Sequence, residues 1–231
     1  MVLFYLGYDS NVGMAEENYD YFVGKLGATE IATREALRLI ENWVNELKPS
    51  SILEIGSGIG TITRLITKSV DSNVQIVVYE KNDWCRSRFW ENITFSNIDL
   101  FVSSSDLLKS DYTKFDFCIV DDFLNQKETD SLVTKFKPKV IFIEGHRRMQ
   151  QMYFAQSLYG LGTRFKYKNH PGCSDSYKGG VSFVTSEFDS YEDYTGISNS
   201  ILVFSRIGFG LFYSKIVEIR SNFSFRKLFR V

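Results

Sequence analysis

A buried strand that runs directly into three closely spaced glycines is the feature that most restricts the fold of this chain. The stretch "SILEIGSGIGTIT" begins at Ser51 with an apolar run, passes through Gly56, Gly58 and Gly60, and continues with apolar residues at helical spacing. Glycine tolerates positive φ angles and lets other groups approach the backbone closely. A strand, a glycine turn and a helix N-terminus in this order predict a surface that a nucleoside or a phosphate can touch.

Apolar strands and amphipathic helices alternate along the chain on both sides of this turn. Their spacing predicts helices over 29–47 (with Thr29 as its N-cap), 60–70, 83–93, 126–136 and 147–161. Short apolar runs predict strands over 51–55, 74–80, 98–104, 115–122 and 137–145, then an antiparallel pair over 163–168 and 179–186. The order predicts an α/β fold with a doubly wound, seven-stranded, mostly parallel sheet and helices on both faces. Ligands of such sheets bind beyond the carboxyl ends of the strands.

Charge and cysteine content restrict the partners and the compartment. The net charge of −1 gives no global reason to expect a nucleic acid partner, because domains that bind nucleic acids usually carry a basic excess. Cys85, Cys118 and Cys173 are far apart and form no Cys-x-x-Cys pair, which indicates a reducing, cytoplasmic environment. No uncharged run approaches the ~20 residues that a transmembrane helix needs. We therefore expect a cytoplasmic protein without a transmembrane segment.

Two common nucleotide-binding motifs do not match the glycine turn. The dinucleotide pattern Gly-x-Gly-x-x-Gly would place its third glycine at position 61, where this chain has Thr61. The phosphate-binding pattern Gly-x-x-x-x-Gly-Lys-Ser/Thr is absent from the sequence. These mismatches argue against an NAD-dependent oxidoreductase.

The stretch "LEIGSGIG" resembles the first motif of class I S-adenosylmethionine-dependent methyltransferases. The order of strands and helices over about 28–186 is also similar to that family, and its layout is closest to small-molecule O-methyltransferases. The resemblance implies a Rossmann-like fold and S-adenosylmethionine (SAM) as the cofactor. It also implies that the turn wraps the amino acid part of SAM and that the acid before it holds the SAM ammonium group; the residues concerned are Glu54, Gly56, Ser57, Gly58 and Gly60.

An acid follows the next predicted strand, in "VVYEKN". The carboxylate of Glu80 can accept hydrogen bonds from both hydroxyls of a ribose, which suits SAM and NAD equally. We expect its neighbour Lys81 to contact the cofactor as well. The family resemblance further implies a polar residue near the adenine after the following strand, and "SSSDLL" offers Ser105 and Asp106.

Acids also end the fourth and fifth predicted strands. Asp121 and Glu144 belong to strand ends that lie roughly 5 Å apart in a parallel sheet, so their carboxylates can converge on one Mg²⁺ ion. The resemblance to catechol-type O-methyltransferases implies such a metal. However, "DDFLNQK" lacks the lysine base of that pattern, and "EGH" stands where the pattern has Asp-Asn. Without a metal, Asp121 is a substrate-facing catalytic acid or a cap on the following helix. We also expect Asp121 to contact the cofactor.

Methyl transfer needs an aligned nucleophile and a base that takes its proton. His146 follows the fifth strand, at the edge where the ligand is expected, and is the candidate base. The adjacent Arg147 and Arg148 lower the pKa expected for His146 and keep it neutral. Alternatively, the two arginines bind an anionic group of the substrate. The second histidine, His170, lies before the last strand.

The two ends of the chain extend the predicted domain at 29–186. Residues 1–28 form an expected N-terminal helical lid, and the candidates that cover cofactor and substrate are Tyr19, Tyr21, Phe22 and Glu30. Residues 187–231 form a C-terminal extension that is rich in basic and aromatic residues toward its end. Such a stretch can bind RNA, an anionic membrane surface or a partner subunit. We favour packing within a homodimer or over the substrate, because the rest of the chain is not basic.

Taken with the resemblance, these features predict a SAM-dependent methyltransferase that acts on a small molecule, at oxygen. The Asn/Asp-Pro-Pro-aromatic motif of amino-methylating nucleic-acid enzymes is absent, which makes an RNA methyltransferase a weaker hypothesis. An aminopropyl transferase-like enzyme stays open as a second hypothesis. So does a catalytically inactive scaffold that keeps the cofactor pocket.

Overall fold

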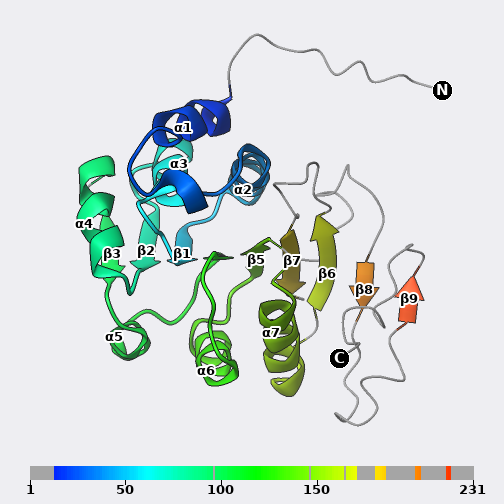
Figure 1. Cartoon of the computed structure of the whole chain (residues 1–231). Coiled ribbons are helices and arrows are strands. Elements are labelled where there is room, and N and C mark those ends of the chain that lie inside the picture. Colours follow the sequence, from blue (N-terminus) through cyan, green and yellow to red (C-terminus); the bar gives the residue numbers. More distant parts are fainter. Residues whose placement is uncertain are drawn as a thin grey trace, which may run out of the picture.

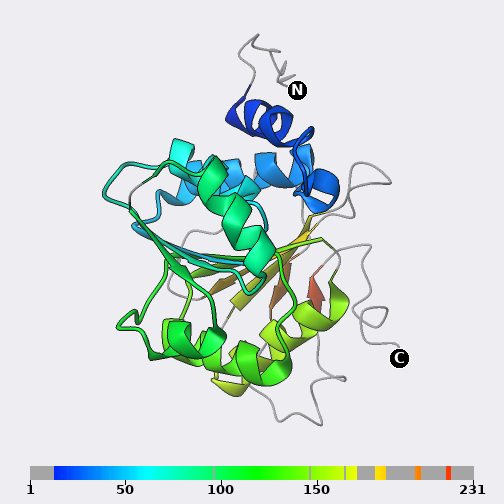
Figure 2. The same ribbon diagram turned by 60° about the vertical axis from the view of Figure 1, so that its left-hand side comes forward.

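A central sheet with a layer of helices on each face organises the protein (Figures 1 and 2). The computed structural model describes residues 13–95, 97–145, 147–163, 165–170, 180–185, 201–203 and 217–219. The helices are α1 (Met14–Phe22), the 3₁₀ turn η1 (Ala28–Glu30), α2 (Arg34–Leu47), α3 (Thr61–Ser69), α4 (Asp83–Asn92), α5 (Ser104–Lys109), α6 (Gln126–Phe136) and α7 (Arg148–Gly160). Within these ranges, no helix combines the length and the apolar character needed to cross a bilayer.

The strands form one sheet in the order β3-β2-β1-β4-β5-β7-β6-β8-β9. Their bounds are β1 (Ser51–Ile55), β2 (Gln75–Tyr79), β3 (Ile98–Phe101), β4 (Phe117–Val120), β5 (Val140–Glu144), β6 (Phe165–His170), β7 (Gly180–Thr185), β8 (Ile201–Val203) and β9 (Val217–Ile219). The first five are parallel, and β7 runs antiparallel between β5 and β6. The predicted doubly wound, mostly parallel fold is confirmed, and two short strands from the predicted C-terminal extension lengthen its sheet.

The strand order reverses between β1 and β4, which pair in parallel with Ile55 beside Val120. The chain leaves β1 toward β2 on one side and leaves β4 toward β5 on the other. A crevice therefore opens beyond the carboxyl ends of these two strands, which is where sheets of this kind bind ligands. The glycine turn (residues 56–60) and Asp121 both follow these strand ends directly.

Two apolar cores hold the layers together, one on each face of the sheet. Alternate strand residues such as Ile52, Val78 and Ile119 pack toward α2, α3 and α4, and their neighbours such as Leu53, Val77 and Cys118 pack toward α5, α6 and α7. Because both faces are covered, the central strands β1, β2, β4 and β5 consist mainly of apolar residues. This explains why runs such as "SILEI" lack the alternation of a half-exposed strand.

The start of α2 differs from the prediction. The helix begins at Arg34, and the hydroxyl of Thr33 accepts a hydrogen bond from the amide of Ala36 at 3.3 Å. Thr33 is therefore the N-cap and the prediction of Thr29 was wrong, because residues 28–30 form a separate 3₁₀ turn. Helix α1 lies within the N-terminal segment that the sequence predicted to be helical, whereas α5 was not predicted as a helix. Helix α1 packs against α2 and α3, and the buried Asn18 donates a hydrogen bond to the carbonyl of Thr61 at 2.8 Å.

Candidate functional site

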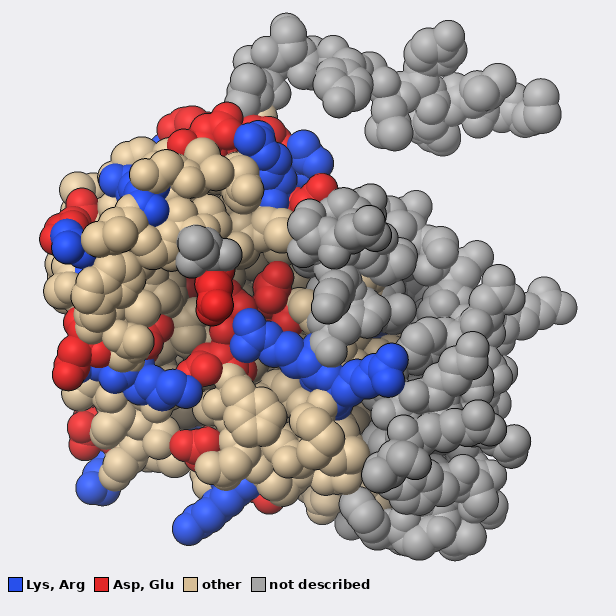
Figure 3. Space-filling view, viewed as in Figure 1, with Lys and Arg blue, Asp and Glu red and all other residues tan. Residues whose placement is uncertain are grey.

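A cavity of about 500 Å³ opens at the carboxyl ends of β1, β2, β4 and β5. Its walls come from η1 and the residues just after it, the glycine turn, the beginning of α4, and the residues that follow β4 and β5. Acidic side chains gather in this hollow, and basic side chains border its lower edge (Figure 3). The cavity lies at the reversal of strand order, where the sequence predicted a ligand.

The three glycines of the turn have positive φ angles but different surroundings. At Gly56 (φ +83°), an added Cβ would lie 2.6 Å from the Cβ of Asp122 and 2.9 Å from its amide nitrogen. At Gly60 (φ +95°), an added Cβ would lie 3.1 Å from the side chain of Ile93. At Gly58 (φ +53°), which lines the cavity, an added Cβ would meet nothing within 4 Å among the described residues. Two of the glycines thus allow close packing of the protein on itself, and of the three only Gly58 has open space where a side chain would point, although Gly56 also lines the cavity.

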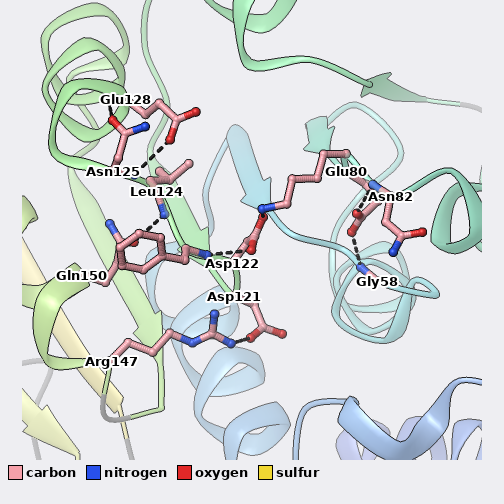
Figure 4. Close-up of polar contacts among 12 residues, drawn as sticks. Gly58, Glu80, Asn82, Asp121, Asp122, Leu124, Asn125, Glu128, Arg147 and Gln150 are labelled. Atoms are coloured by element: carbon pink, nitrogen blue, oxygen red, sulfur yellow. Dashed lines mark hydrogen bonds and ion pairs between the residues drawn. The ribbon is translucent and has the colours of Figure 1, made fainter.

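The carboxylate of Glu80 joins the end of β2 to the glycine turn (Figure 4). Its Oε2 accepts a hydrogen bond from the amide of Gly58, and its Oε1 accepts one from the amide of Asn82, each at 2.8 Å. Glu80 is only 7% exposed and lines the cavity. Because each carboxylate oxygen has two lone pairs, Glu80 can still accept one hydrogen bond on each oxygen from a ligand.

Three buried polar atoms around the glycine turn lack a hydrogen-bond partner within the described part of the chain. They are Oε1 of Glu54, Oγ of Ser57 and Oγ1 of Thr61, and the two hydroxyls belong to residues that line the cavity. Buried polar groups in proteins are almost always paired, because an unpaired one costs about 1–3 kcal/mol. Helix α3 also begins here without a side-chain cap. The floor of the cavity therefore has the hydrogen-bonding groups that a polar ligand would satisfy.

Glu54 lies on β1 beneath the turn and is fully buried. Its Oε2 accepts a hydrogen bond from the hydroxyl of Thr63 at 2.6 Å. Burial raises the pKa of Glu54 to about 8, since the Thr63 hydrogen bond offsets only part of the loss of hydration and the charge of Glu80 adds to the increase. Without a bound cation, Glu54 therefore holds a proton at neutral pH.

We expect Glu54 to make the stability of the unliganded protein fall as the pH rises. A carboxyl whose pKa increases from 4.5 to about 8 on folding stabilises the fold below pH 4.5, and this contribution is lost as the pH rises through 8. In Glu54→Gln, which is neutral at every pH, the decrease in unfolding free energy between pH 5 and pH 8 should shrink by about 3–4 kcal/mol, since one pKa unit corresponds to about 1.4 kcal/mol and most of the shift from 4.5 to about 8 lies between these two pH values. Urea unfolding at the two pH values measures this. An unchanged decrease in the variant would show that Glu54 is ionised in the folded protein.

Asp121 and Glu144 form a pair of acids at the ends of β4 and β5, and both line the cavity. The Nη2 atom of Arg147 lies 2.6 Å from Oδ1 of Asp121 and 3.8 Å from Oε2 of Glu144. Burial raises the pKa of Asp121 well above its usual range, and the neighbouring charge of Glu144 raises it further. Burial also raises the pKa of Glu144. The sheet therefore brings these two acids together as the sequence predicted, with an arginine beside them.

This arrangement does not fit the expected Mg²⁺ site. A divalent ion held by Asp121 and Glu144 would have to share their oxygens with the guanidinium of Arg147, which already contacts both carboxylates. No group of three or more Asp, Glu, His or Cys side chains suited to a metal ion occurs within the described residues. We therefore assign no chemical step to a metal here.

The remaining predicted cofactor residues lie at different distances from the cavity. Lys81 lines it, and its Nζ lies 2.6 Å from Oδ2 of Asp122, so this ion pair connects the ends of β2 and β4. Ser105 and Asp106 lie in the first turn of α5 and are not among the described residues that line the cavity. There the carboxylate of Asp106 accepts a hydrogen bond from the hydroxyl of Ser103 at 2.8 Å.

The predicted lid residues and the two histidines have different positions relative to the cavity. Glu30 lines it, whereas Tyr19, Tyr21 and Phe22 belong to α1 and are not among the described residues of its wall. His146, the candidate base, lies outside the described residues. His170 is buried on β6 with Nε2 2.8 Å from Oγ of Ser182. Burial lowers the pKa of His170 to about 3, which keeps it neutral and favours a structural role.

Sequence reasoning missed the part of the wall that comes from α4. Trp84 and Cys85 line the cavity one turn beyond Glu80, and Asn82 caps the helix by accepting hydrogen bonds from both of their amides. The Trp84 ring packs against Gly27, whose φ of +89° and missing side chain make room for it. The available signal was Asn82 at the N-cap position, two residues after the strand-ending Glu80.

Solved methyltransferase structures share this fold. An O-methyltransferase from Bacillus cereus in complex with S-adenosylhomocysteine (SAH) matches with a TM-score of 0.56 and 15% identity, over 74% of this chain and 90% of that one. A SAH-bound methyltransferase from Podospora anserina matches at 0.55 and 14%, over 75% and 88%. The O-methyltransferase TomG from Streptomyces achromogenes, in complex with SAM, matches at 0.54 and 14%, over 77% and 89%. The chain therefore has the fold of class I SAM-dependent methyltransferases.

The similarity between this chain and these methyltransferases is one of structure and not of sequence. No protein-family model matches this sequence, and no curated protein matches it either.

Proposed function

We propose that this protein is a SAM-dependent methyltransferase that acts on a small molecule, at oxygen. The observation that carries the proposal is the cavity at the reversal of strand order, where Glu80 and the glycine turn face buried hydroxyls without partners. Solved proteins of the same fold are described as O-methyltransferases in complex with SAM or SAH, which supports the same cofactor for this chain.

The residues of the cavity fit the parts of this cofactor. Glu80 has a free lone pair on each oxygen for the two ribose hydroxyls, and the open space at Gly58 accommodates a ligand close to the backbone. Ser57 and Thr61 offer unpaired hydroxyls to the amino acid part. Glu54 lies beneath the turn, where a cationic ammonium group would favour its ionised form.

The adenine end of the proposed site has two sets of candidate residues. The ring of Trp84 lines the cavity and offers an aromatic face on which a base can stack. Lys81 borders the same region. Ser105 and Asp106, at the start of α5, stay predictions for the adenine edge.

The acceptor lies, in our proposal, at the Asp121 end of the cavity. Bound SAM supplies an electrophilic methyl group on a positively charged sulfur. The carboxylate of Asp121 takes the proton of the acceptor hydroxyl, and because burial and the nearby Glu144 raise its pKa, it is a stronger base than an exposed aspartate. Glu144 shares the proton with Asp121. His146 stays a second candidate for the base.

Calorimetric titration with SAM, SAH and NAD tests the cofactor assignment. We expect the purified protein to bind SAM and SAH with micromolar-range affinity and not to bind NAD. A panel of hydroxylated small molecules with labelled SAM then tests transfer, and an amine series tests the aminopropyl transferase-like hypothesis. Binding without transfer to any acceptor would favour the scaffold hypothesis, and binding of NAD alone would refute the proposed function.

We further propose that the enzyme works in the cytoplasm, in agreement with Cys85 and Cys118, which are free thiols. Cys173 lies outside the described residues. The homodimer predicted through the C-terminal extension also stays a proposal, since most of the extension lies outside the described residues. Sedimentation analysis of the full chain tests it.

A further inference from the structure

Arg147 is placed to act as a built-in cation. It is the residue directly before α7, and it lines the cavity with 35% of its side chain exposed. Its Nη2 atom contacts Asp121 at 2.6 Å (Figure 4). The same atom lies 3.8 Å from Oε2 of Glu144. The carboxyl ends of two neighbouring parallel strands therefore present their acids to one guanidinium.

The buried acids Asp121 and Glu144 need a positive charge beside them, and Arg147 supplies it. The acid pair is mostly buried, with 17% of the Asp121 side chain and 15% of the Glu144 side chain exposed. Two such carboxylates need a compensating cation or a shared proton, because burying unpaired charge is costly. The other cation in the described cavity wall, Lys81, is paired with Asp122 at 2.6 Å.

The guanidinium of Arg147 also has hydrogen-bond donors that the two acids do not use. An arginine carries N–H groups on Nε, Nη1 and Nη2 in one plane. Both ion contacts use Nη2. The Nε and Nη1 groups, which form no hydrogen bond within the described part of the chain, can bind an oxygen atom of a ligand in the cavity.

We propose that Arg147 occupies, as a fixed cation, the position between Asp121 and Glu144 that a divalent ion would otherwise take. Together with the proton that the two acids share, it balances the charge of the acid pair, and it excludes metal ions and binds the acceptor oxygen through its remaining N–H groups. The last of these roles rests on the proposed methyltransferase function, and the exclusion of metal ions does not. The acceptor class that fits is a hydroxylated molecule that needs no metal chelation.

Metal titration of the unliganded full chain tests the exclusion of metal ions, with Mn²⁺ as the probe followed by electron paramagnetic resonance. We expect the wild type to bind no stoichiometric Mn²⁺ at millimolar concentration. We expect Arg147→Met to bind one Mn²⁺ at least about tenfold more tightly, because two carboxylates that a guanidinium had neutralised become available to a hard cation. Arg147→Lys is the matched control that keeps a positive charge and gains no metal, and Arg147→Met/Asp121→Asn should lose the gained site.

Two outcomes would overturn the proposal. Stoichiometric Mn²⁺ binding by the wild type that Asp121→Asn abolishes would show that Arg147 does not exclude the ion, and this holds even where Arg147→Met fails to fold. A folded Arg147→Met protein, checked by thermal unfolding, that gains no Mn²⁺ would show that the acid pair is no latent metal site.

Turnover separates this proposal from the proposed function. With an acceptor from the panel, EDTA should leave the wild-type kcat and KM unchanged, and Arg147→Lys should raise the KM for the acceptor while SAH affinity stays within about twofold. Loss of turnover in EDTA that added Mg²⁺ restores would overturn the role of Arg147. Failure of the wild type to bind SAH would instead refute the proposed function and leave the Mn²⁺ result intact.

Discussion

Replacing Glu80 with alanine should weaken SAH binding by at least about a hundredfold, which corresponds to about 3 kcal/mol. The carboxylate of Glu80 has one free lone pair on each oxygen for the ribose hydroxyls, and hydrogen bonds to charged groups contribute about 1.5–3 kcal/mol each. The substitution also removes the acceptor of the Gly58 and Asn82 amides, so the turn loses the group that holds it toward β2. Isothermal titration calorimetry of the variant measures the loss.

Two further variants show whether the loss is specific. Glu80→Gln keeps one acceptor oxygen and replaces the other with an NH₂ group, so its affinity should lie between those of the wild type and Glu80→Ala. Glu91→Ala removes an acid of α4 that pairs with Arg88 on the surface, and it should bind SAH normally. Wild-type affinity in a folded Glu80→Ala protein would exclude Glu80 from the cofactor site.

Gly56→Ala and Gly58→Ala should separate stability from binding. At Gly56 the new methyl group would lie 2.6 Å from the Cβ of Asp122 and 2.9 Å from its amide nitrogen, at a φ of +83°. We expect a loss of about 2–5 kcal/mol in unfolding free energy from the left-handed conformation and the overpacking together. At Gly58 the methyl group meets nothing within 4 Å, so only the conformational penalty of about 1–2 kcal/mol applies.

The two variants should rank in the opposite order for SAH binding: Gly56→Ala loses more stability, and Gly58→Ala loses more affinity. Because Gly58 borders the open cavity, its methyl group fills space that the proposed ligand uses, and SAH affinity should fall at least about tenfold in a folded protein. Urea unfolding and calorimetry on both variants give the two quantities. Equal stabilities would mean that the contact between Gly56 and Asp122 relaxes without cost, and normal SAH binding by Gly58→Ala would place the ligand elsewhere.

Local patterns in the sequence predicted the elements that build the site. The bounds of β1 and α6 agree with the predicted ranges 51–55 and 126–136 to the residue. A strand buried on both faces is mainly apolar, as β1 is apart from Ser51 and Glu54, and α6 begins at a capping box of Asn125 and Glu128. These signals depend only on residues a few positions apart.

Elements that depend on distant contacts were predicted without bounds, as in the helical N-terminal segment, or were missed. Helix α1, "MAEENYDYF", has few apolar residues at helical spacing, and it is stabilised by burying Phe22 and Asn18 against its neighbours. Strands β8 and β9 have three residues each, too few for a pattern, and exist through pairing with strands already in place.

The sequence by itself determined the fold class, the glycine turn and the acid that faces it from the next strand, because each is set by neighbouring residues. Only the tertiary structure decided that Gly56 must make room for Asp122, that Trp84 packs against Gly27, and that Arg147 meets the acid pair. The physical reason is the strand order. Placing β4 beside β1 and β5 beside β4 brings together side chains far apart in the chain, and no local spacing encodes which of them will share one cavity.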